Sequence, residues 1–199
     1  GMEPRGILIT GASRGLGKEL AERYLDLGRT VFGCSRQDGA IEHPNYHHFE
    51  VDVGDEDGVV SMMREIAASK IGLHLLINNA GISQSSLAIM TRASAAHDIM
   101  RTNLLGTFLV SREALKMMQR QREGRIINFS SINVPLGSAG SSMYNATKAG
   151  IEALAMVLTR ESGKVDVTIN TLGLSLVATT GMLEALSKKA LDEKQSGLL

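Results

Sequence analysis

The chain has 199 residues, of which 43% are hydrophobic, and this length predicts a single domain spanning residues 1–199. Its 21 acidic and 21 basic side chains balance, which argues against a nucleic-acid partner or a membrane surface. The sequence has neither an apolar run long enough to span a bilayer nor a recognisable secretory leader, and its one cysteine, Cys34, cannot form an intrachain disulfide. These features predict a cytoplasmic protein.

Short apolar segments alternate with segments of helical periodicity along the chain. The expected strands are residues 7–10, 30–35, 46–53, 73–77, 125–129 and 165–172. The expected helices are residues 15–27, 55–70, 95–121, 143–162 and 179–194, and polar loops are expected at 37–45 and 133–142. Because strands and helices alternate, the sequence predicts an α/β fold, a doubly wound parallel sheet in a three-layer Rossmann arrangement.

The first strand runs directly into a glycine-rich turn that opens a helix. Glycine is required where a diphosphate approaches the backbone, and the N–H groups at the start of the helix then hold the phosphates. A plain tight turn is the alternative, but the position between first strand and first helix favours a dinucleotide site. The residues predicted to bind the cofactor here are Gly11, Ser13, Arg14, Gly15, Leu16 and Gly17.

Polar residues also follow the other predicted strands. In an open parallel sheet the ligand lies beyond the carboxyl ends of the strands, where the strand order reverses. Five residues fall at those ends: Thr10, Arg36, Asp52, Asn78 and Ser131. This convergence is a second, independent argument for a nucleotide site.

Tyr144 and Lys148 lie four residues apart on a predicted helix and therefore share one face. An ammonium near a phenol favours the phenolate, so we expect Lys148 to lower the pKa of Tyr144 and make proton transfer feasible near neutral pH. Ser131 ends the preceding strand, and its hydroxyl could bond a substrate oxygen. Such a pair alone is more often a solvated helix face, but the glycine turn favours catalysis.

These motifs together resemble the short-chain dehydrogenase/reductase family. The matching residues are 10–17 (TGASRGLG), 78–81 (NNAG), Asn103, Ser131 and 144–148 (YNATK). They follow the order and spacing of the family over residues 5–172. In overall texture the chain looks most like the 3-oxoacyl-(acyl-carrier-protein) reductases within that family.

The resemblance implies specific roles for these residues. Tyr144 is the acid/base that protonates the carbonyl oxygen, and Ser131, rather than its neighbour Ser130, holds that oxygen. Lys148 lowers the pKa of Tyr144 and bonds the nicotinamide ribose, and Asn103 holds a water molecule in a proton relay. The residues implied to support the sheet and the cofactor after the fourth strand are Asn79, Ala80 and Gly81.

Cofactor preference can be argued from charge at the end of the second strand. Relatives that use NAD carry an acidic residue there, whereas this chain has Ser35 followed by Arg36. Arg36 and Arg14 could pair with a 2′-phosphate, so NADP(H) is predicted and NAD(H) is less favoured; Asp38 is the dissenting residue. The dipeptide Asp52–Val53 resembles the family's adenine-binding pair, and capping of the next helix is its alternative role.

The resemblance weakens after the sixth strand. The family's Pro-Gly pair is missing there, and Thr180 is the residue expected to contact the nicotinamide end of the cofactor. The family's seventh strand has no counterpart in the 199 residues. A shortened variant, a partner that covers the edge of the sheet, or residues left out of the sequence would each account for this.

The sequence therefore predicts NADPH-dependent, reversible reduction of a carbonyl to an alcohol. The substrate is expected to be a small molecule or an acyl-carrier compound such as a 3-oxoacyl thioester. A non-catalytic NAD(P)-binding sensor on the same fold is the alternative. No metal site is predicted, because His43, His47 and His48 lack regular ligand spacing. By resemblance, a homodimer or homotetramer is expected through the helices 95–121 and 143–162.

Overall fold

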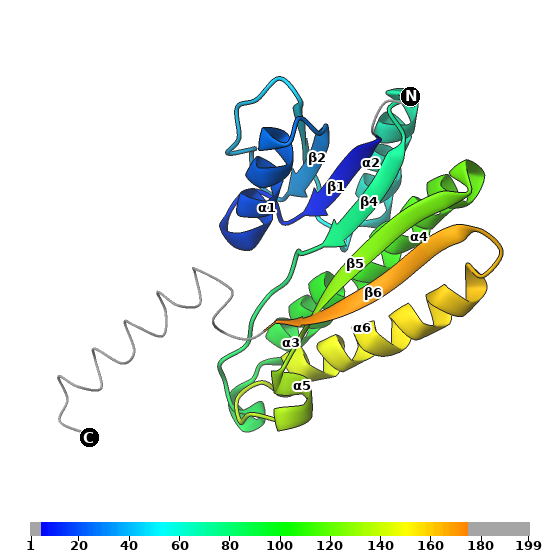
Figure 1. Cartoon of the computed structure of the whole chain (residues 1–199). Coiled ribbons are helices and arrows are strands. Elements are labelled where there is room, and N and C mark those ends of the chain that lie inside the picture. Colours follow the sequence, from blue (N-terminus) through cyan, green and yellow to red (C-terminus); the bar gives the residue numbers. More distant parts are fainter. Residues whose placement is uncertain (1–4, 175–199) are drawn as a thin grey trace.

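The computed structural model describes residues 5–174 (Figure 1). In this part of the chain six parallel strands form one sheet in the order β3-β2-β1-β4-β5-β6. The strands are β1 (Gly6–Thr10), β2 (Val31–Ser35), β3 (Tyr46–Glu50), β4 (Leu73–Asn78), β5 (Glu123–Ser131) and β6 (Asp166–Leu174). The order reverses between β1 and β4, which is the switch point where an open α/β sheet binds its ligand.

Helices cover both faces of the sheet, so the predicted doubly wound Rossmann arrangement is confirmed. The helices are α1 (Gly15–Asp26), α2 (Glu56–Ala68), α3 (Ala93–Ile99), α4 (Gly106–Gln121), α5 (Asn133–Leu136) and α6 (Ser142–Glu161). Helix α1 lies on one face, against β1 and β2, and α2, α4 and α6 lie on the other (Figure 1).

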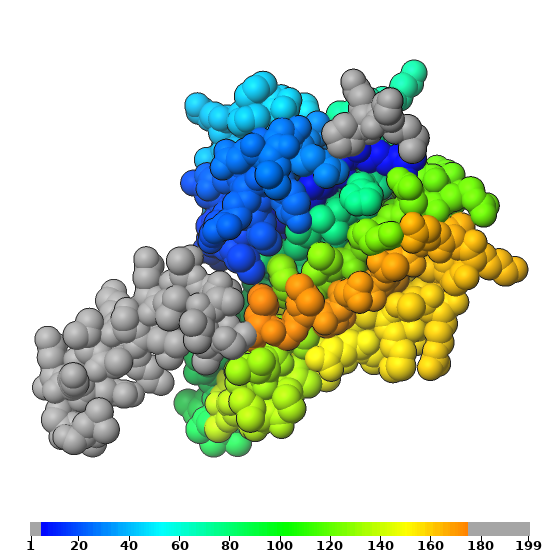
Figure 2. All heavy atoms as spheres, in the orientation of Figure 1, coloured from blue at the N-terminus to red at the C-terminus, as the bar shows by residue number. Residues whose placement is uncertain are grey.

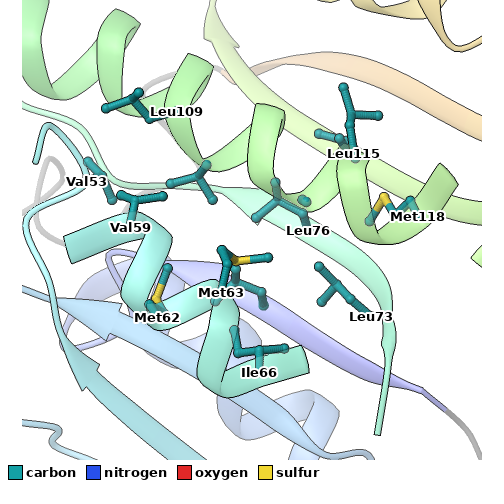
Figure 3. Close-up of a cluster of buried hydrophobic side chains, with 14 of the residues drawn as sticks. Val53, Val59, Met62, Met63, Ile66, Leu73, Leu76, Leu109, Leu115 and Met118 are labelled. Atoms are coloured by element: carbon teal, nitrogen blue, oxygen red, sulfur yellow. The ribbon is translucent and has the colours of Figure 1, made fainter. Parts of the chain in front are cut away.

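The core is split by the sheet into two apolar layers. On the face covered by α2 and α4, side chains from both helices pack with Leu76 of β4 (Figure 3). Leu8 of β1 belongs to the same cluster, and both leucines are fully buried. On the other face, Ala21 and Leu25 of α1 pack on alternate residues of β1. Strand β1 is therefore buried from both sides, which fixes the position of the turn that follows it.

The prediction of one continuous helix over residues 95–121 is wrong, because the helix is interrupted. A π-helical turn, Met100–Leu105, separates α3 from α4. The Thr107 hydroxyl donates to the carbonyl of Asn103 (2.8 Å), and a β-carbon on Gly106 would lie 2.5 Å from Val53. The wider turn buries Asn103 completely, and a local change of helical pitch of this kind has no signature in apolar periodicity.

Several element boundaries also differ from the prediction by a few residues. Strand β3 ends at Glu50 rather than at residue 53. The predicted loop 133–142 contains the single turn α5, which closes with a bond from the Gly137 amide to the Asn133 carbonyl and with Gly137 at φ +61°. That left-handed conformation suits glycine, so the turn stops there.

Strand β6 forms one edge of the sheet in the described residues. Its side chains alternate between burial under α6 and exposure, and Leu172, on the exposed side, is 48% accessible. The strand lies open on the surface in the space-filling view (Figure 2). The predicted helix 179–194 and the predicted contact of Thr180 fall outside the described residues.

Candidate active site

The turn after β1 brings the start of α1 against the end of the strand. Gly11 and Gly15 have φ values of +67° and +56°, a region that suits glycine. Gly17 has ordinary dihedrals, but a β-carbon on it would collide with the carbonyl oxygen of Gly11. The loop therefore needs glycine at these positions for two different reasons, conformation at 11 and 15 and close approach at 17.

The segment after β4 is tied to the same turn. The Thr10 hydroxyl accepts hydrogen bonds from the amides of Asn79 (3.0 Å) and Ala80 (2.9 Å). The Asn79 side-chain amide donates to the Gly11 carbonyl at 3.2 Å. These bonds join the two strand ends on either side of the switch point and fix the distance between them.

This turn fits the pyrophosphate of a dinucleotide. Within residues 5–174 no side chain caps helix α1, and its first turn holds no acidic residue, so in this part of the structure its first N–H groups remain available to an anion. Apart from the chain neighbours of Gly15 and the backbone of its own helix, no atom of the described residues lies within 4 Å of its β-carbon position, so the described part of the chain leaves the backbone open there. Arg14 precedes the helix, and its side chain adds positive charge. Ser13 and Leu16 complete the predicted set on the same turn.

The end of β2 carries the residues predicted to meet the adenosine ribose. The Ser35 hydroxyl donates to the Gln37 carbonyl (2.7 Å) and lies 3.1 Å from His48 Nε2. Arg36 is exposed directly after it. Asp38 faces Glu50, whose pKa is raised by hydrogen bonding and repulsion from the Asp38 carboxyl. The exposed Arg36 therefore places a positive charge at the end of β2, where the adenosine ribose is expected.

The Asp52 carboxylate pairs with an arginine and does not cap the helix that follows it. Burial acts to raise the pKa of Asp52, but bonds from Arg101 (2.6 Å) and from the Gly54 amide (2.9 Å) outweigh it and lower the value. The N-cap of α2 is Asp55, whose carboxylate accepts a hydrogen bond from the Gly58 amide at 3.2 Å. The capping alternative for Asp52 is therefore wrong.

Tyr144 and Lys148 share one face of α6, with the Lys148 nitrogen 5.6 Å from the centre of the Tyr144 ring. That nitrogen donates to the Phe129 carbonyl of β5 at 2.9 Å. Burial lowers the pKa of Lys148 to about 8. Burial also raises the pKa of Tyr144, and the Ser131 hydroxyl opposes that shift.

The expected lowering of the Tyr144 pKa is therefore not found in this structure. The reason is burial: desolvation of the phenol raises its pKa, and the Ser131 hydroxyl offsets only part of that rise.

The two adjacent serines at the end of β5 point to opposite faces of the sheet. The Ser130 hydroxyl donates to Glu152 of α6 at 2.6 Å. The Ser131 hydroxyl accepts from the Asn133 amide (3.1 Å) and is the serine that interacts with Tyr144. Strand alternation thus leaves Ser131, and not Ser130, beside the phenol.

Asn103, on the π-helical turn, links the segment after β4 to α6. Its side-chain oxygen accepts from the Ile82 amide (2.7 Å), and its nitrogen donates to the Ile82 carbonyl (2.9 Å) and to the Thr147 hydroxyl (3.3 Å). Gly81 lies next to it, with its β-carbon position 3.4 Å from that oxygen. The side chain is thus a structural clamp, and three of its four hydrogen-bonding positions are taken.

Two site-lining amides were missed by sequence reasoning. Gln84 bonds the first turn of α6, and Asn145 donates to the Asn133 carbonyl at 2.7 Å, next to Ser131. Asn145 lies within the motif 144–148, but neither residue was given a role, because only the fold brings each one near the backbone groups that it binds.

Comparison with known proteins agrees with this geometry. The family model described as short chain dehydrogenase matches residues 5–191. The 3-oxoacyl-(acyl-carrier-protein) reductase FabG of Vibrio cholerae is 32% identical in an alignment 200 residues long that covers 98% of this chain and 80% of the relative. The Escherichia coli protein of the same name is 31% identical, with coverage of 96% and 79%.

Solved structures point the same way. A structure described as ElxO with NADP bound has a TM-score of 0.84 at 28% identity and covers 99% of this chain and 80% of its own. A short-chain dehydrogenase from Streptomyces avermitilis has a TM-score of 0.82 at 27% identity, with coverage of 87% and 66%. The chain belongs to the short-chain dehydrogenase family of oxidoreductases. The family and the enzyme class predicted from the motifs are confirmed.

The depressed pKa of Lys148 predicts a pH dependence of stability. Between the folded value of about 8 and the ordinary value of 10.5 the unfolded chain binds more protons, so the free energy of unfolding rises with pH in that window. Lys148→Met removes the buried cation. We expect it to be more stable than the wild type at neutral pH, with an advantage that shrinks by about 3 kcal/mol across the window. Denaturant unfolding at a series of pH values measures this.

The matched control for that experiment is Lys164→Met, because Lys164 is exposed. Its difference from the wild type should stay constant across the same window. A pH-independent difference for Lys148→Met as well would contradict the assigned burial of the cation.

Proposed function

We propose that this chain reduces a carbonyl group to an alcohol with NADPH, in a reversible reaction. The observation that carries the proposal is the cluster of Tyr144, Lys148 and Ser131 at the carboxyl ends of the strands, on the edge that holds the glycine turn. Asn103 connects the two parts, since it bonds Ile82 after the cofactor segment and Thr147 beside Lys148. The phenol and the dinucleotide turn thus belong to one bonded assembly.

Each residue has a defined task in this proposal. Bound NADPH supplies hydride to the carbonyl carbon. The Tyr144 phenol, whose pKa is raised by burial, donates its proton to the carbonyl oxygen. The Ser131 hydroxyl donates a hydrogen bond to the same oxygen and orients it. Lys148 holds positive charge behind the phenol and stabilises the anion left on it.

We infer a preference for NADP(H) over NAD(H). Arg36 and Arg14 are exposed cations on the two loops that flank the expected adenosine site, and a 2′-phosphate would pair with such groups. Asp38, the dissenting residue, lies beside the Glu50 carboxyl, and these two acidic groups are the argument for NAD(H). The structure of ElxO with NADP bound supports this choice. Asp52 and Val53 remain the residues proposed to contact the adenine.

For the substrate, we propose a 3-oxoacyl thioester or another small carbonyl compound. The support is the similarity to reductases of 3-oxoacyl-(acyl-carrier-protein) at about 30% identity. Within residues 5–174 no helix is both long and apolar enough to cross a bilayer. A cytoplasmic location and a single domain over residues 1–199 remain proposals.

We also propose that the chain assembles as a homodimer or homotetramer through α4 and α6. An apolar hollow of about 560 Å³ lies on the outer side of these helices and the π-helical turn. Its lining includes Leu105 and Phe108, which are 43% and 36% exposed. Met156 and Val157 of α6 are also about half exposed. Large apolar side chains exposed together on a folded surface are typical of an interface.

Tyr144→Phe tests the proposed chemistry. The variant keeps the ring and loses the proton donor, so we expect turnover to fall by at least about a thousandfold while NADPH still binds. Oxidation of NADPH and of NADH with a panel of ketones and 3-oxoacyl thioesters measures turnover and cofactor preference together. Tyr24→Phe, on α1, is the control that should keep wild-type activity.

Retained activity in Tyr144→Phe would refute the catalytic assignment. A wild-type chain that binds NADPH but turns over none of the compounds would favour the sensor alternative. Faster oxidation of NADH than of NADPH would overturn the cofactor preference.

Phe108→Asp tests the proposed interface. A carboxylate in the apolar hollow costs desolvation on assembly, so we expect a shift from oligomer to monomer in light scattering coupled to size exclusion. Leu27→Asp, at an exposed leucine that follows α1, should leave the mass unchanged. A monomeric wild type, or an unchanged mass for Phe108→Asp, would contradict this interface.

A further inference from the structure

The first turn of α6 is capped by a residue from a distant part of the chain. The Gln84 side-chain oxygen accepts hydrogen bonds from the amides of Met143 (2.8 Å) and Tyr144 (3.0 Å). These are the second and third residues of the helix counted from its cap, Ser141. An N-cap side chain normally bonds these positions. Here the acceptor comes from the loop between β4 and α3, 60 residues before Tyr144.

The local cap residue does not compete for this role. Ser141 occupies the N-cap position, but its side chain makes no capping bond. Its hydroxyl donates instead to the Ser138 carbonyl at 2.6 Å. The amides of Met143 and Tyr144 would have no side-chain cap without Gln84.

The other end of the Gln84 amide is also fixed. Its nitrogen donates to the Ser86 carbonyl and to the Thr91 hydroxyl, each at 3.1 Å, and lies 3.4 Å from the Ser142 hydroxyl. The Ser86 amide in turn donates to the Gly140 carbonyl at 3.1 Å. Donor and acceptor ends are both occupied, so the amide has one orientation and the acceptor stays on the helix.

We propose that Gln84 is a positioning residue for the reduction: by capping α6 at the amide of Tyr144 itself, it fixes where the phenol lies relative to the cofactor. The inference rests on the proposed function. Loss of the cap frees the first turn of α6, and a displacement of about 1 Å at a reacting group can cost up to a hundredfold in rate. Substrate and cofactor contacts elsewhere are untouched, so the loss should fall on kcat.

The test compares three variants of the full chain. Gln84→Ala removes the cap, and we expect kcat to fall about tenfold or more with the NADPH dissociation constant within about twofold of wild type. Gln84→Glu keeps acceptor oxygens at the helix start, where negative charge is favourable, and should retain more of kcat than Gln84→Ala. Equal losses in the two variants, or an unchanged kcat in Gln84→Ala, would overturn the proposal.

Gln121→Ala is the matched control. Gln121 also bridges backbone groups with its side-chain amide, accepting from the Leu73 amide (2.9 Å) and donating to the Leu73 carbonyl (2.7 Å), at the opposite end of the strands. It should lower stability and leave kcat unchanged. A comparable loss of kcat in Gln121→Ala would mean that Gln84→Ala acts through general destabilisation, against the proposal.

A second measurement does not depend on turnover. Hydrogen exchange at the Met143 and Tyr144 amides should become faster in Gln84→Ala and stay slow in Gln121→Ala. Unchanged exchange in Gln84→Ala refutes the cap. If the wild type shows no turnover while the two variants show the expected exchange rates, the proposed function is refuted and the cap is not.

Discussion

The close packing of Gly17 against the carbonyl oxygen of Gly11 is the constraint on which the rest of the site depends. A β-carbon has no room there, so the start of α1 is pressed directly against the end of β1. The same oxygen accepts the Asn79 side-chain amide. Three elements therefore meet at one carbonyl, at the point where the strand order of the sheet reverses, and the N–H groups of α1 open toward the expected ligand.

Hydrogen bonds from side-chain amides connect the glycine turn to the residues proposed to react. Asn79 binds the turn, Asn103 clamps Ile82 and Thr147, and Gln84 caps α6 at Tyr144. An amide both donates and accepts and has no charge to neutralise, so it can join backbone segments in a partly buried place at low cost. Lys148 is the contrasting case, because within residues 5–174 its buried charge bonds one backbone carbonyl, and its pKa falls to about 8.

Sequence reasoning found the parts of the site that are contiguous in the chain. The glycine turn, the Tyr144–Lys148 pair and the parallel, doubly wound sheet follow from local spacing and from alternation of strands and helices, which short-range physics controls. The order of the strands in the sheet was not predicted. It did not find the π-helical turn, which depends on the packing of Gly106 against Val53 and on the bond from Thr107 to Asn103. Gln84 was missed for a related reason, since its partners lie 59 and 60 residues away. The direction of the Tyr144 shift was wrong because spacing shows that two groups share a face but not how deeply the phenol is buried.

The most direct test of this account is the affinity of Gly17→Ala for NADPH, measured by isothermal titration calorimetry beside Gly163→Ala. Among the described residues a methyl group at residue 163 meets one atom, at 3.4 Å, whereas one at residue 17 must push α1 away from Gly11 and Asn79. We expect the Gly17 variant to remain folded by circular dichroism and to bind NADPH at least about tenfold more weakly, while the control binds as the wild type does. A folded Gly17→Ala chain with wild-type affinity would contradict the central role of this contact.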